Sequence, residues 1–210
     1  MTSPNPPGGG GVNLSKVTLT KNAPTVSLAK HGGVGGTLRF TLNWNARPGR
    51  GLFKSGGAID LDLACLWEFT DGSKGAVQAL GNLFQAPMNT PQPIIRLSGD
   101  DRTGGGGEEM LIDLNQAVYI KRIVVFAYIY EGAANWADAG GVARLYPATG
   151  PEIEVVLDEP RNGARTCAIA LITNTGGDVQ VQREVRYIDG MQQALDEAYG
   201  WGMNWQGARK

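Results

Sequence analysis

The sequence predicts an all-β protein, a two-sheet antiparallel β-sandwich with a short C-terminal helix. About ten short apolar or alternating runs follow one another along the chain, and residues that favour turns separate them. The 31 glycines among 210 residues agree with many strands and turns. A single segment near the end has its apolar residues at helical spacing, which predicts the one helix.

The strands are predicted from alternation of apolar and polar residues. Residues 37–44 form the clearest half-buried strand, because every second residue there is large and apolar. Residues 120–130 are apolar on both faces, as expected of a central strand that is covered on both sides. The other strand-like runs lie at 12–20, 25–30, 76–83, 94–98, 109–114, 142–146, 153–157, 166–173 and 179–187.

One amphipathic helix is predicted over residues 189–200, packed on the sandwich. Met191, Leu195 and Tyr199 recur at helical spacing. Asp189 is a suitable residue to cap the start of this helix, and the glycine after Tyr199 is a suitable end.

The chain is expected to form one domain, residues 12–210, after a tail rich in proline and glycine, residues 1–11. The first residues lack the features of a signal peptide, and no apolar run approaches the roughly 20 residues that span a bilayer. We therefore expect a cytoplasmic protein without membrane insertion. With 19 basic and 20 acidic residues the net charge is −1, which argues against non-specific nucleic-acid binding.

Two acidic segments are the strongest candidates for a site. In a strand, Ile59, Leu61 and Leu63 would form a buried row, which places Asp60 and Asp62 together on the opposite face. Two carboxylates on one face repel each other unless a cation or solvent separates them. The second segment is a glycine-rich loop that carries more carboxylates.

These residue types suit a hard cation. Calcium takes about six to eight oxygen ligands, often with carboxylates and backbone carbonyls mixed. The candidate metal ligands are Asp60, Asp62, Asp100, Asp101, Gly104, Glu108 and Glu109. The same pattern also has an explanation without metal, because alternating Asp residues protect an exposed edge strand and Gly-Asp-Asp is common in solvated turns.

The sequence offers little for catalysis, and we expect no enzymatic activity. His31 is the only histidine, it lies beside glycines in a predicted loop, and no nucleophile-elbow pattern accompanies it. Cys65 and Cys167 lie in apolar runs and are predicted to be buried, reduced thiols, which argues against a zinc site or thiol redox chemistry. A disulfide between them is the alternative, and it depends on a geometry that the sequence does not give. A glycosidase pair of Asp60 and Glu109 would depend on a separation that the sequence does not give.

An aromatic cluster is the candidate partner-binding surface. Trp136 belongs to one aromatic segment, and Trp201 and Trp205 belong to the segment that follows the predicted helix. Aromatic residues framed by small and polar ones are common at protein interfaces. They are equally common where a terminal segment seals the end of a sandwich, and that alternative is slightly favoured.

Several short motifs, in order along residues 12–210, resemble the TerA branch of the TerD family of tellurium-resistance proteins. The motifs lie at 57–63, 79–82, 99–104, 128–132 with 135–136, 161–163, and 198–202 with 205. The resemblance implies a calcium-binding β-sandwich that is cytoplasmic and not an enzyme. It implies a role in tellurite and chemical-stress resistance. It also implies other Ter-system proteins as partners, some of them associated with the membrane.

The two acidic motifs of this family fall on residues 58–62 and 99–109, with two departures. Ala58 stands where the first motif has its first acid, and residues 105–109 carry fewer carboxylates than the second motif. Calcium affinity falls as charged ligands are lost. We therefore expect one weak calcium site or none, with a metal-independent interaction scaffold that uses the aromatic C-terminal surface as the alternative.

Overall fold

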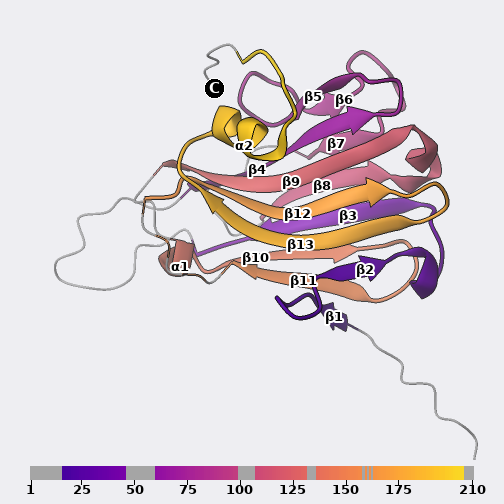
Figure 1. Ribbon diagram of the computed structural model, residues 1–210, viewed down its shortest axis with the longest axis horizontal. Helices are drawn as coiled ribbons and strands as arrows, with labels where there is room; N and C mark the ends of the chain where they lie inside the picture. Colours follow the sequence, from indigo (N-terminus) through magenta and orange to yellow (C-terminus); the bar gives the residue numbers. More distant parts are fainter. Residues whose placement is uncertain are drawn as a thin grey trace, which may run out of the picture.

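The computed structural model describes residues 16–45, 60–98, 107–131, 136–157, 159, 161 and 163–205. The expected tail, residues 1–11, lies outside them. The described chain forms two β-sheets that face each other, with a few short helices (Figure 1). The predicted fold class, an all-β sandwich with a short C-terminal helix, is therefore confirmed.

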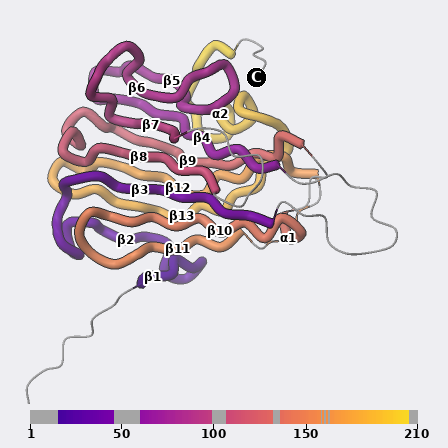
Figure 2. The backbone as a smooth tube through the Cα atoms, turned by 180° about the vertical axis from the view of Figure 1, so that it is seen from behind, coloured from indigo at the N-terminus to yellow at the C-terminus, as the bar shows by residue number. Residues whose placement is uncertain are grey.

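One sheet has seven strands, in the order β1-β11-β10-β3-β8-β7-β6, and it faces the viewer in Figure 2. Its neighbouring strands run antiparallel, except that β1 runs parallel to β11. The strands are β1 (Lys16–Thr18), β3 (Thr37–Asn43), β6 (Gln85–Ala86), β7 (Ile95–Leu97), β8 (Glu108–Asp113), β10 (Gly141–Tyr146) and β11 (Glu152–Leu157).

The other sheet has six strands, in the order β2-β13-β12-β9-β4-β5, and all of its pairs are antiparallel. The long strand β9 is central, as residues 120–130 predict. The strands are β2 (Thr25–Ser27), β4 (Asp60–Phe69), β5 (Lys74–Val77), β9 (Ile120–Glu131), β12 (Thr166–Asn174) and β13 (Val179–Ile188).

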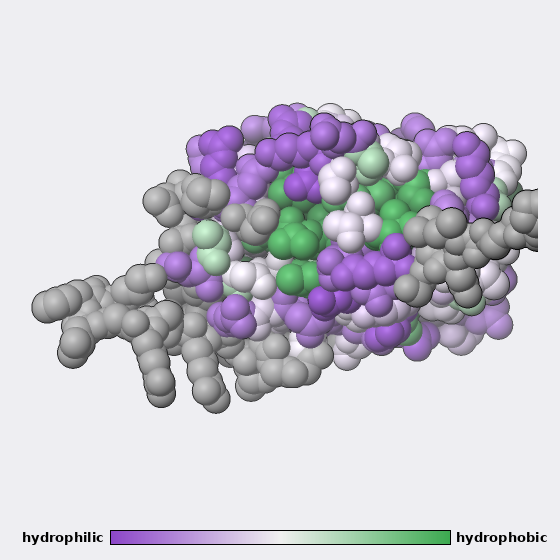
Figure 3. Space-filling model, turned by 90° about the horizontal axis from the view of Figure 1, so that it is seen from below, coloured by the Kyte–Doolittle hydropathy of each residue, from purple (hydrophilic) through white to green (hydrophobic). Residues whose placement is uncertain are grey.

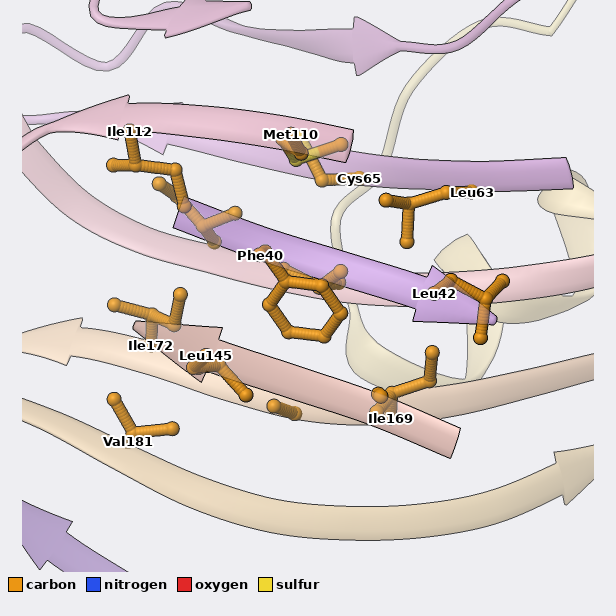
Figure 4. Packing of buried hydrophobic residues seen from close by; sticks show 14 of the residues in the cluster. Phe40, Leu42, Leu63, Cys65, Met110, Ile112, Leu145, Ile169, Ile172 and Val181 are labelled. Atoms are coloured by element: carbon orange, nitrogen blue, oxygen red, sulfur yellow. The ribbon is translucent and has the colours of Figure 1, made fainter. Parts of the chain in front are cut away.

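Two layers of buried side chains explain why β9 is apolar on both faces. The larger layer fills the space between the sheets, where Phe40 and Leu42 of β3 meet Ile169 and Ile172 of β12 (Figure 4). The smaller layer lies on the outer face of the six-stranded sheet, beneath the C-terminal helix and the residues after it. Alternate residues of β9 enter the two layers, so the strand is buried on both faces from Ile123 to Ile129.

Four short helices complete the described chain. They are the 3-10 helices η1 (Ala29–His31) and η2 (Leu114–Tyr119), and the α-helices α1 (Trp136–Ala139) and α2 (Gln192–Tyr199). In the parts of the chain that the structure describes, no helix is long and apolar enough to cross a membrane.

The C-terminal helix α2 begins later than predicted. Met191, not Asp189, is the residue before its first turn, and no side chain caps it. Gly190 has φ of 129°, a conformation that turns the chain between β13 and α2 and separates Asp189 from the helix start. The end is as predicted, because Gly200 adopts the left-handed conformation and its N–H bonds to the carbonyl of Asp196.

Some strand boundaries also differ from the prediction. The run at 76–83 is a strand only to Val77, after which a turn with a bridge between Gln78 and Leu83 follows. The two-residue strand β6 and the four-residue helix α1 were not predicted, since segments this short carry no measurable periodicity.

The two sheets are joined along the side of the molecule that carries β1 and β2. The chain passes there from the edge of one sheet to the edge of the other. Figure 3 shows an apolar strip on this side, bordered by hydrophilic residues. A hollow of about 400 Å³ lies there, and Val17, Leu19 and Val26 are among the residues that line it.

Candidate metal centre

The two aspartates of the first acidic segment are buried at the start of β4. Asp60 is 6% exposed and Asp62 is fully buried. Strand β4 pairs with β5 only from Cys65 onward, but its outer face is covered, because Ala64 and Leu66 belong to the outer core layer. The explanation of these carboxylates as wet residues on an edge strand is therefore wrong.

The pairing of β4 with β9 is irregular beside the two aspartates. Asp62 pairs with Tyr128 of β9, but the register shifts between Asp60 and Leu61, and Asp60 pairs with Glu131. This irregularity places an extra residue, Tyr130, on β9 and leaves the two-residue repeat of β4 uninterrupted. Sequence patterns give no sign of it, because it depends on how β4 meets β9.

Glu108 enters the space between the sheets from β8. Gly107, the residue before it, has φ of 72°, and a Cβ atom there would lie 2.6 Å from the carbonyl oxygen of Leu42. Only glycine fits this close approach to β3. Glu108 is 2% exposed, and its Oε2 accepts a hydrogen bond from the backbone N–H of Leu63 on β4.

The Leu63 amide is available to Glu108 because β5 is short. Strand β5 pairs with β4 only from Cys65 to Glu68, so the described part of β5 does not reach the start of β4. The Glu108 carboxylate supplies the acceptor that a neighbouring strand would otherwise supply. The peptide that it bonds joins Asp62 to Leu63, so a carboxylate of the seven-stranded sheet reaches the backbone of β4 directly after Asp62.

Glu109 does not belong to this group. Successive residues of a strand point to opposite faces, so Glu109 lies on the outer face of the seven-stranded sheet. Its Oε2 lies 3.2 Å from the guanidinium of Arg39, which also stacks 4.2 Å from the centre of the Tyr146 ring. Glu109 is therefore committed to a surface ion pair, and its predicted role as a metal ligand is not supported.

The other predicted ligands lie beyond the described residues. Asp100, Asp101 and Gly104 belong to the unassigned segment 99–106, as do two of the glycines that distinguish the second acidic motif; Ala58 lies in the unassigned segment 46–59. Within the described chain, no three His, Cys, Asp or Glu residues form a group that could hold a metal ion. A metal site that includes Asp60, Asp62 and Glu108 would therefore need further ligands from beyond the described residues.

Two of the three tryptophans predicted to contact a partner are buried. Trp136 is fully buried, and its Nε1 donates to the carbonyl of Ala164 at 2.8 Å. Trp201 is also fully buried, and its Nε1 donates to the carbonyl of Trp67 at 3.1 Å. As core residues they cannot form a contact surface, so this part of the prediction is corrected in favour of the alternative in which they seal the sandwich.

Trp205 is the member of the set that remains half-exposed. Its Nε1 donates to Oδ2 of Asp196 at 2.9 Å. The same aspartate also accepts from the backbone N–H groups of Gly202 and Met203, at 2.7 and 2.9 Å. Asp196 thus fixes the chain after α2 and presents Trp205 at its surface, where a role in partner binding stays a prediction.

The two cysteines are buried and not joined in a disulfide. Burial raises the pKa of the Cys65 thiol and of the Cys167 thiol far above the usual cysteine range. Both are therefore neutral thiols at physiological pH, as predicted from the apolar runs that contain them. A thiol in this state is a poor nucleophile and a poor metal ligand.

The fold and the site together define a two-sheet β-sandwich protein with buried carboxylates at the start of two strands, one from each sheet. Comparison with known proteins then identifies its relatives. The chain is a homologue of the tellurium resistance protein TerA from Alcaligenes sp., with 40% identity over 206 residues. This confirms the TerA-type resemblance of the sequence.

The alignment covers 95% of this chain but 60% of the relative, so the chain spans about three fifths of that protein's length. No family model matches the chain. No solved structure matches it either.

Proposed function

We propose that the protein acts in resistance to tellurium compounds as a non-catalytic binding protein whose partner-binding surface depends on calcium. Homology to a TerA tellurium resistance protein supports the proposed role in tellurium resistance. The chain spans 60% of that relative's length, so the activity and partners of the whole relative are proposed for this chain and not established by the comparison. The proposed partners are other Ter-system proteins, including membrane-associated ones.

The observation that carries the calcium proposal is the position of Glu108. Its buried carboxylate crosses from one sheet to the peptide that follows the buried Asp62 on the other sheet. Buried carboxylates are unfavourable unless positive charge or hydrogen bonds compensate them. When bound, calcium would supply positive charge at this point.

The proposed ligand set follows from this position. Asp60, Asp62 and Glu108 would act with Asp100, Asp101 and the Gly104 carbonyl, and Glu109 is left out because it pairs with Arg39. Ligands from β4, from β8 and from segment 99–106 would tie that segment to both sheets. A surface ordered in this way is what a partner protein would recognise.

The non-catalytic part of the proposal rests on residue chemistry. The only histidine, His31, is exposed, and both cysteines are buried with raised pKa values. None of these groups has the environment of an activated nucleophile or of a redox pair.

Calorimetric titration of the chelator-treated protein with calcium, with magnesium as the ion control, tests the metal site. We expect saturable, calcium-selective heat and a higher melting temperature, because a ligand that binds only the folded state stabilises it. The double variant Asp62→Asn/Glu108→Gln should lose this heat, since it removes two charged ligands while keeping an acceptor for the Leu63 amide.

Glu109→Gln is the matched control, because it removes the same kind of charge one residue away on the opposite face. This variant should bind calcium as the wild type does. If the double variant binds calcium unchanged, or if Glu109→Gln loses binding equally, the proposed ligand set is wrong. Melting each variant without calcium separates a lost site from a lost fold.

A metal-independent interaction scaffold is the second candidate. The observation that favours it is that no three potential ligands form a metal group within the described residues. On this alternative the half-exposed Trp205 and its neighbours after α2 form the contact surface. A flat titration up to millimolar calcium, together with loss of partner binding in Trp205→Ala, would favour this candidate over the first.

A further inference from the structure

A second hollow, of about 380 Å³, lies at the far end of β4 from the buried carboxylates. The ten residues of β4 separate the two places by about 30 Å, at about 3.3 Å per residue. The hollow is bounded by the turn after β4, by the loop between β6 and β7, and by η2, at the end of the sandwich away from α1 (Figure 1). Its volume is in the range of sites that hold a ligand or a large side chain.

One exposed apolar side chain lines this hollow, and two more follow or precede lining residues in the sequence. Met88 is 50% exposed, Val118 is 67% exposed and Tyr119 is 56% exposed, and these are the exposed large hydrophobic residues of the described chain. Tyr119 lines the hollow, Val118 precedes it, and Met88 follows Pro87, which also lines the hollow. Val118 itself lines a different hollow, together with Val34 and Asn174, so Tyr119 is the exposed apolar side chain of this lining.

The lining carries a single charge, the carboxylate of Asp71. Its Oδ1 accepts hydrogen bonds from the backbone N–H and the hydroxyl of Ser73, at 2.9 and 2.6 Å, which fixes the group in the turn. No Lys or Arg in the described ranges forms an ion pair with Asp71. The hollow therefore presents one positioned negative charge to a ligand.

Hydrogen bonding inside the lining leaves further acceptors. The side-chain nitrogen of Gln116 donates to Asp113 at 2.9 Å and to the Gln92 carbonyl at 3.5 Å. The side-chain oxygen of Gln116 is then the atom that can accept a hydrogen bond from a ligand. The Thr70 hydroxyl donates to the carbonyl of Val118 at 3.5 Å. A carboxylate, an amide oxygen and an exposed aromatic ring together suit a cation that only donates hydrogen bonds.

We propose that this hollow binds an arginine side chain of a partner protein. The guanidinium would lie between the Asp71 carboxylate and the Tyr119 ring, both of which line the hollow. Arginine fits better than lysine, because its planar group is more weakly hydrated and stacks on aromatic rings while it donates to a carboxylate. The proposal does not depend on calcium, since the buried carboxylates lie at the other end of β4.

Nuclear magnetic resonance titration of the isotope-labelled protein with the peptide acetyl-Ala-Leu-Arg-Leu-Ala-amide tests the site. We expect saturable shifts confined to residues 69–71, 87–94 and 116–119. The same peptide with citrulline in place of arginine keeps the shape but loses the charge, and it should bind at least about tenfold more weakly. Equal binding of the two peptides, or shifts elsewhere only, would overturn the proposal.

Three variants give a second measurement. Asp71→Asn keeps an acceptor for Ser73 and so preserves the turn, and Tyr119→Ala removes an exposed ring; each should weaken the arginine peptide at least about fivefold. Asp189→Asn removes an exposed carboxylate outside the hollow and should bind as the wild type does. If Asp71→Asn binds normally, or if Asp189→Asn is weakened equally, the assignment is wrong.

Discussion

Neighbouring glutamates of one strand have opposite environments in this protein. Glu108 is buried against the amide of Leu63, whereas Glu109 pairs with Arg39 on the outer face. The sequence shows two adjacent glutamates and allows either to turn inward. Which of them does so is decided by Gly107, whose close approach to β3 fixes the register of β8.

Glu68 is a buried carboxylate that sequence analysis did not single out. Its side chain is 5% exposed, and its oxygens lie 2.7 Å from Lys121 Nζ and 2.7 Å from Arg122 Nε. Burial by itself would raise the pKa of Glu68, but the hydrogen bonds and charges of the two basic groups together outweigh burial and lower it. No sequence pattern indicates this cluster, because β4 and β9 bring it together.

Glu68→Gln should lower the free energy of unfolding by about 2 kcal/mol at pH 7, because it removes charged hydrogen bonds from a buried position. Since the folded pKa is lowered, the stabilising effect is present above the usual glutamate pKa of about 4.3 and is lost as pH falls toward the lowered value. Urea unfolding of the wild type and the variant should therefore differ at pH 7 and converge in acid. Glu197→Gln, at an exposed position, is the control, and a difference that grows in acid would contradict this account.

At the scale of elements, the C-terminal segment, α2 and the residues after it, packs on the outer face of the six-stranded sheet. Trp201 belongs to the core layer on the outer face of this sheet, and the guanidinium carbon of Arg122 in β9 lies 3.8 Å from the centre of the Trp201 ring. Arg122 also donates to the carbonyls of Tyr199 and Gly200, and Lys74 donates to the carbonyl of Trp201 at 2.7 Å. The segment after α2 is therefore part of the fold rather than a free aromatic surface.

Trp201→Ala should lower the free energy of unfolding by about 4 kcal/mol, as expected for a fully buried tryptophan. Trp205→Ala should lower it by about 1 kcal/mol, because it removes a half-exposed ring and one hydrogen bond. Urea denaturation of the two variants measures both values. Similar losses of unfolding free energy in the two variants would show that Trp201 and Trp205 contribute equally to the fold, which would contradict this account. Because the expected loss is small for Trp205→Ala, that variant is the one suited to tests of partner binding.

At the scale of the whole molecule, the two sheets share one continuous core. Residues from both sheets meet in the same layer, including Leu42 and Met110 on one side and Leu63 and Val181 on the other (Figure 4). Neither sheet can keep its inner face buried without the other. The sandwich is therefore expected to unfold as one cooperative unit.

Leu42→Ala tests this expectation, because it opens a cavity from the seven-stranded sheet and should lower the free energy of unfolding by about 3 kcal/mol. Far-ultraviolet circular dichroism and tryptophan fluorescence should report one shared transition in the wild type and one shared shift in the variant. Two separated transitions, or a shift of only one signal, would mean that the sheets unfold independently.

The sequence by itself determined the fold class, the central strand, the end of the C-terminal helix and the TerA-type relationship. These properties follow from local information: alternation, composition, a glycine after a helix, and short motifs in a fixed order. The run at 120–130 predicted a strand covered on both faces, because exposure of its apolar side chains to water on either face would be unfavourable.

Only the tertiary structure decided which charged and aromatic residues are buried. Asp62, Glu108, Glu68 and Trp201 lie in the interior because segments distant in the sequence cover them. Strand alternation says which residues share a face, but not whether another layer lies on that face. That depends on how the two sheets and the C-terminal segment pack together. The sequence could therefore identify candidate acidic residues for the site, but not their arrangement in space.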